Sequence, residues 1–166
     1  FRGDWQYRDV SVCLEHQHPL AALWKEKNVF ARVDIQTQLS AIMDDVRAGK
    51  FDQPLVTVSD YDRWLDRRLC GNIDTTCLSL HSTYSVTTLC GLLGQALVNI
   101  DEPALGNTIN RAQAVGFAAL AGGPDVTRDA LDRLLRAVAA DHAQPTRALR
   151  KMYAGLSHAH VNDQEL

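Results

Sequence analysis

Two cysteines and a histidine lie close together in the stretch RLCGNIDTTCLSLH, where six residues separate Cys70 from Cys77 and three separate Cys77 from His81. The residues between the two cysteines include glycine, asparagine and aspartate, which turn readily, so a disulfide could close this loop. The remaining pair, Cys13 and Cys90, could then join the N-terminal segment to a central helix. We expect the Cys70–Cys77 disulfide, although the four cysteines allow three pairings among which the sequence does not choose.

The same residues allow a metal site as an alternative. Cys70, Cys77 and His81 would supply three ligands to zinc. Three residues are candidates for a more distant fourth ligand: Cys13, His16 and His18. Structural zinc sites usually present ligands in tight pairs such as CxxC, and the sequence contains no such pair. Free thiols packed as small apolar side chains are the third interpretation, and all three stay open.

A nucleophilic cysteine is a separate hypothesis, and Cys90 in TTLCGLLG is its candidate. Cysteine hydrolases place the thiol where a helix N-terminus and a histidine favour the thiolate. Cys90 instead lies between Leu89 and Leu93 in an apolar stripe, where a buried and inert thiol is expected. The sequence identifies no histidine partner, no other catalytic signature and no cofactor motif. It therefore favours a binding protein over an enzyme, with a hydrolase based on Cys90 as the alternative.

Apolar residues recur at helical spacing along most of the chain, and the clearest stripe runs from Ile35 to Val46. Ser59 followed by an acid three residues later predicts a helix start. The expected helices cover 32–50, 59–69, 82–100, 107–120, 125–142 and 146–156, and the stretches 5–15 and 19–28 are candidates for further helices. The one strand signal, at 55–58, is too isolated to make a sheet. We predict an all-α fold, a single compact bundle-like domain of six or seven helices over 1–166, with 1–6 and 157–166 frayed.

The charge and hydropathy of the chain argue against two classes of function. The chain has 17 basic and 20 acidic residues with no basic cluster, which argues against a nucleic-acid partner. No apolar run approaches the roughly 18 residues that span a bilayer. A start at Phe1 rather than methionine, together with the cysteines, suggests an exported protein, periplasmic or secreted; a cytoplasmic location remains open.

These observations predict a protein-interaction module, such as a disulfide-stapled helical inhibitor or immunity-type protein. The expected binding surface is the 70–77 loop together with the residues just before it. Those residues include tyrosine, tryptophan and arginine, which are the commonest residue types in binding hot spots. Its members are Tyr61, Trp64, Arg67, Arg68, Asn72 and Asp74. The competing interpretation places Trp64 in the core. A third function class is a helical subunit of a larger assembly, such as a coat or scaffold, in which 107–123 packs against another copy; a homo-oligomer is compatible with this reading.

Overall fold

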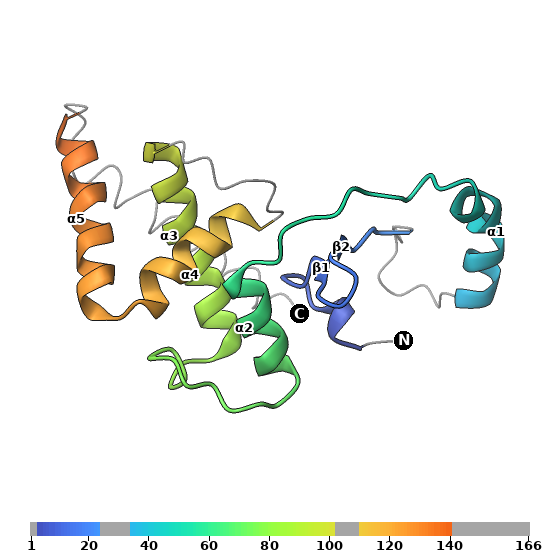
Figure 1. The fold of residues 1–166 in the computed structure, drawn as a ribbon, viewed down its shortest axis with the longest axis horizontal. Coiled ribbons are helices and arrows are strands. Elements are labelled where there is room, and N and C mark those ends of the chain that lie inside the picture. Colours follow the sequence, from blue (N-terminus) through green and yellow to red (C-terminus); the bar gives the residue numbers. More distant parts are fainter. Residues whose placement is uncertain (1–2, 24–33, 102–109, 141–166) are drawn as a thin grey trace.

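The structure is a computed structural model that describes residues 3–23, 34–101 and 110–140 (Figure 1). Within these ranges the chain forms five α-helices, one short 3-10 helix and a ribbon of two short strands. The elements are η1 (Gly3–Gln6), β1 (Val12–Cys13), β2 (His18–Pro19), α1 (Ile35–Arg47), α2 (Asp60–Leu69), α3 (Thr83–Asp101), α4 (Arg111–Ala121) and α5 (Pro124–Ala140). The predicted helix-rich fold is confirmed. The helix expected at 146–156 lies outside the described residues.

The N-terminal segment is not helical as expected. In place of a helix over 5–15 the chain forms η1 and then β1, which pairs antiparallel with β2. The described part of the second expected helix, 19–23, contains no helix either. Val12 is buried against Val56 and Val58 of the extended 52–59 segment, and the Val56 N–H donates to the Gln17 carbonyl at 2.9 Å. Burial alternates along 55–58, where Val56 and Val58 are buried and the residues before each are exposed, which is the period of an extended chain rather than of a helix.

Helix α1 forms where its apolar stripe predicts it, beginning at Asp34, whose side chain accepts from the Gln36 N–H. It lies at one end of the molecule, away from α3, α4 and α5 (Figure 1). None of its residues is buried, and Ile35 is 54% exposed. The stripe that would normally face a core is therefore on the surface.

Helices α3 and α4 cross at two glycines, and this crossing organises the other helices. A Cβ atom at Gly94 would lie 1.6 Å from the Ala112 carbonyl oxygen, and one at Gly116 would lie 1.9 Å from the Cys90 carbonyl oxygen. Only glycine permits two helix backbones to approach this closely. The glycine- and alanine-rich stretch expected to contact another copy is thus, in its described part, packed against α3 of the same chain.

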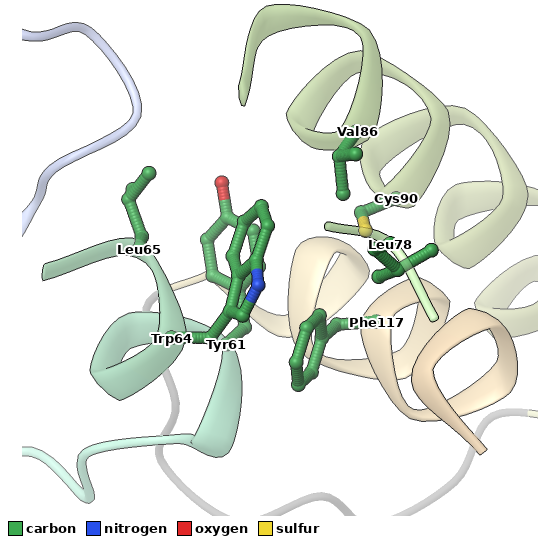
Figure 2. Packing of buried hydrophobic residues seen from close by; sticks show 7 residues of the cluster. All are labelled: Tyr61, Trp64, Leu65, Leu78, Val86, Cys90 and Phe117. Atoms are coloured by element: carbon green, nitrogen blue, oxygen red, sulfur yellow. The ribbon is translucent and has the colours of Figure 1, made fainter. Parts of the chain in front are cut away.

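The main core lies between α2, α3 and α4 (Figure 2). Trp64 and Tyr61 of α2 face Cys90 of α3 and Phe117 of α4, and the Trp64 and Phe117 ring centroids are 5.2 Å apart. Trp64 is 1% exposed. A second cluster, built by Leu93, Leu97, Ala119 and Ala130, attaches α5 to the crossing. The interpretation of Trp64 as a core residue is the correct one.

Helix α2 begins with the predicted capping box. The Ser59 hydroxyl accepts from the Asp62 N–H, and the Asp62 carboxylate accepts from the Ser59 N–H at 2.9 Å. Asp62 is buried, and its other carboxylate oxygen accepts from the Asn110 amide at 3.3 Å. The same Asn110 amide donates to the Ser11 hydroxyl at 2.6 Å. Asn110 therefore ties the N-terminal segment and α2 to the start of α4.

Replacing Gly116 with alanine should destabilise the protein by about 3 kcal/mol or more, because the new methyl group overlaps backbone that cannot move aside. Gly91→Ala is the matched control, since a Cβ there has no neighbour closer than 4.0 Å. It should be neutral or stabilise α3 by up to about 1 kcal/mol through helix propensity. Urea unfolding of the two variants tests this, and equal stabilities would contradict the close crossing.

Candidate functional site

A buried carboxylate, Asp74, holds the 70–82 loop against α2. It accepts from the Trp64 indole N–H at 2.9 Å and from the Arg68 guanidinium at 3.1 Å. Its second oxygen accepts from the Thr76 N–H at 2.8 Å and the Thr76 hydroxyl at 2.7 Å. We call Trp64, Arg68, Asp74 and Thr76 the Asp74 network. All the donors converge on one side chain, so the loop has a fixed shape.

Arg68 extends the Asp74 network along the loop. Its guanidinium donates to the carbonyls of Leu78, at 3.2 Å, and of His81. It also lies over the Trp64 ring, 5.2 Å from the centroid, which adds a cation–π contact. The side chains of Arg68 and Asp74 are 13% and 7% exposed, so their ion pair is shielded from solvent. One arginine thus positions the backbone from Asp74 to His81.

The pKa of Asp74 reflects this environment. Burial alone would raise it, but the hydrogen bonds from Thr76 and Trp64 and the charge of Arg68 together hold the pKa below its ordinary value. A carboxyl whose pKa is lower in the folded state stabilises the fold above its unfolded pKa of about 3.9. That contribution is lost as the pH falls below this value.

The loop held in this way forms one wall of an open, mainly apolar groove. Its other walls are the first turns of α3 and the junction of α4 with α5, and its volume is about 570 Å³. The lining residues are Cys77, Leu78, His81, Ser85, Val86, Leu89, Leu120, Gly123, Pro124, Thr127, Arg128 and Leu131. We call this the apolar groove. Leu89 of α3 and Leu131 of α5 both line it, and Leu131 is 42% exposed.

Several polar groups of the apolar groove are engaged within the chain. The Cys77 thiol donates to the Leu120 carbonyl at 3.3 Å. The Thr127 hydroxyl lies 3.0 Å from the carbonyls of Ala119 and Gly123. Arg128 pairs with Asp125 at 2.9 Å. With these groups already bonded, the groove is suited to binding apolar surface.

The residues predicted to form a binding surface are separated by the structure. Tyr61 and Trp64 are in the core, while Arg68 and Asp74 are bonded to each other within the Asp74 network. The side chains of Arg67 and Asn72 are exposed, and a binding role for them stays a prediction. Asp74 has a structural role in this arrangement, because four donors depend on it.

The expected disulfides are not formed, since all four cysteines are free. Cys70 caps the C-terminus of α2 and is exposed, while the Cys77 thiol is directed to the Leu120 carbonyl. Cys13 is buried in the N-terminal ribbon, where its sulfur lies 3.4 Å from the His16 imidazole. Hydrogen bonds rather than a covalent bond therefore set the shape of the 70–77 loop, so turn-forming residues between two cysteines did not imply a disulfide.

The metal alternative fails on the same geometry. Across the part of the chain that the structure describes, no three histidine, cysteine, aspartate or glutamate side chains are arranged to hold a metal ion. Cys70, Cys77 and His81 are included in that part. They are neighbours in sequence, but their side chains do not form a ligand group.

Cys90 has the environment of a core residue. It is fully buried between α2 and α4, and burial raises the pKa of its thiol to about 12 (Figure 2). A nucleophilic cysteine needs a lowered pKa and access to substrate. The placement of Cys90 supplies neither, so the hydrolase alternative gains no support.

Leu89 and Leu131 are functional candidates that sequence reasoning missed. Both belong to helical stripes whose residues are expected to face a core. Their helices do pack on the core, but through neighbouring residues such as Leu93 and Ala130. Periodicity indicates the apolar side of a helix but not how much of that side a neighbouring helix covers. No signal in the sequence therefore separates the groove residues from the core residues.

Comparison of the chain with protein-family models, with curated proteins and with solved structures finds no match. Among the helices that the structure describes, none is long and apolar enough to cross a bilayer.

Thiol reactivity tests the cysteine assignments. Iodoacetamide at pH 8 should alkylate the exposed Cys70 and Cys77 in the native protein without prior reduction. The buried Cys13 and Cys90 should react only after unfolding in denaturant. Mass spectrometry of the intact protein and of its peptides counts and locates the labels. Thiols that become reactive only after a reductant is added would contradict the structure and support the predicted disulfides.

Proposed function

We propose that the protein is an interaction module whose apolar groove receives an amphipathic helix of a protein partner. The observation that carries the proposal is the open groove itself, of about 570 Å³ with a mainly apolar lining. A groove of this kind binds a helix through side chains spaced at i, i+4 and i+7. The proposal keeps the interaction role predicted from the sequence and moves its site from the 70–77 loop to the face beside it.

The shape of the exposed apolar surface favours a helix over a small ligand. Leu131 lines the groove and Leu135 follows one turn later on α5, where it is also exposed. The apolar surface therefore continues along α5 beyond the groove. An elongated, open surface leaves much of a small ligand in water, whereas small-molecule sites enclose most of theirs. A helix lying along α5 would cover both leucines.

The walls of the groove are preorganised. The Asp74 network fixes the loop wall, and the α3–α4 crossing fixes the opposite walls. Ordering the site therefore costs little when a partner binds, which supports affinity without a large interface. This preorganisation does not require a disulfide. The exported location was inferred partly from the cysteines, and it stays a prediction.

A labelled model peptide tests the proposal. A neutral peptide of sixteen residues would carry leucine at positions 3, 7, 10 and 14 in a glutamine, lysine and glutamate background. Its fluorescence anisotropy should rise saturably with protein concentration. Leu131→Glu should weaken binding at least tenfold, equivalent to about 1.4 kcal/mol, because it places a charge in the apolar wall.

Leu80→Glu is the control, since Leu80 is 91% exposed and lies outside the groove. It should change the affinity less than twofold. A scrambled peptide with the same composition controls for nonspecific adsorption. Absence of saturable binding, or equal effects of the two substitutions, would contradict the proposed function.

A further inference from the structure

Helix α1 carries an apolar face with no partner in the described structure. Its stripe consists of Ile35, Leu39, Ile42, Met43 and Val46, at the spacing of a helix that docks into a groove. None of these residues is buried, and none belongs to the three apolar clusters formed by the described residues. Leaving such a face in water forgoes roughly 25 cal/mol for each Å² that could be covered.

The apolar groove offers the complementary surface. Helix α1 has 13 residues, a length of about 20 Å at 1.5 Å per residue. This is enough to reach along α5 from the groove at Leu131 past Leu135, which is one turn away. The chain thus contains both an amphipathic helix without a partner and a groove suited to one. We infer that α1 of one copy docks in the apolar groove of a second copy.

The connection of α1 to the rest of the chain argues for a second copy. Val56 is held to the N-terminal ribbon by its hydrogen bond to Gln17, and Val58 is buried beside it. Only residues 48–55 remain to let α1 move, a reach of roughly 28 Å even when fully extended. Figure 1 shows α1 and α5 at opposite ends of the long axis, with the ribbon between them. A second copy can supply α1 to the groove without any change in this arrangement.

Reciprocal docking would double the area of the interface. A single helix of this length covers less surface than the roughly 1,600 Å² of a standard stable interface. In a two-fold dimer each copy would give its α1 and receive the other, so the contact is made twice. This inference rests on the proposed function, because it names the partner of the same groove.

Cys77 provides a reporter inside the groove. In a full-length Cys70→Ser background, Ile42→Cys places a thiol on the apolar stripe of α1. Mild oxidation with diamide should join it to Cys77 of a second copy and give a covalent dimer on a nonreducing gel. Ala41→Cys is the matched control: it is the neighbouring residue but lies away from the stripe. It should give at least tenfold less dimer, and Cys77→Ser should abolish the crosslink.

Sedimentation of the uncrosslinked protein makes the test independent of disulfide geometry. The wild-type chain should be a dimer at 100 µM, and Leu39→Asp should shift it to monomer. A monomeric wild-type chain would overturn the inference, as would a crosslink confined to one chain.

The peptide titration, repeated on Leu39→Asp, separates this inference from the proposed function. Peptide binding by a wild-type chain that is monomeric would overturn the inference alone. No peptide binding even to Leu39→Asp would overturn the proposed function.

Discussion

The Asp74 carboxylate is the interaction on which the rest of the site depends. It accepts hydrogen bonds from the α2 side chains Trp64 and Arg68 and from Thr76 in the loop itself. Buried polar groups are stable only when their partners are satisfied, and here a single acceptor satisfies donors from two segments. Because Arg68 also binds the carbonyls of Leu78 and His81, the loop is fixed along its length. The apolar groove exists because this wall does not collapse into it.

The second constraint is the close approach of α3 and α4. Gly94 and Gly116 bring the backbones together, and this brings Phe117 and Cys90 into the core beside Trp64. Gly123, at φ 95°, turns the chain from α4 into α5, and Leu131 of α5 lines the groove beside this turn. The same helix therefore contributes to the core and to the groove: Leu93 of α3 is buried, and Leu89 of α3 lines the groove.

The sequence predicts the local elements well and the site poorly. Ser59 and Asp62 form the expected capping box, and the stripe of α1 forms the expected helix, because both depend on residues close in sequence. The exposure of that stripe was not predictable from periodicity, since it depends on where the 48–59 segment leads. The pairing of Cys70 with Cys77 was inferred from their spacing and the turn-forming residues between them. The loop is instead shaped by Asp74, whose partners Trp64 and Arg68 lie in the preceding helix. Long-range polar contacts of this kind leave no pattern in a single sequence.

The most direct measurement is amide hydrogen exchange across the 74–82 loop in wild type and in Asp74→Ala. The amides of Thr76, Leu78 and His81 are hydrogen-bonded within the loop. If Asp74 holds the wall, its loss should speed exchange there at least tenfold, lower stability by about 3 kcal/mol and weaken binding of the model peptide. Asp60→Ala, which removes an exposed carboxylate of α2, should leave the exchange, the stability and the peptide binding unchanged. A loop that stays protected in Asp74→Ala, with the groove still binding peptide, would contradict the account.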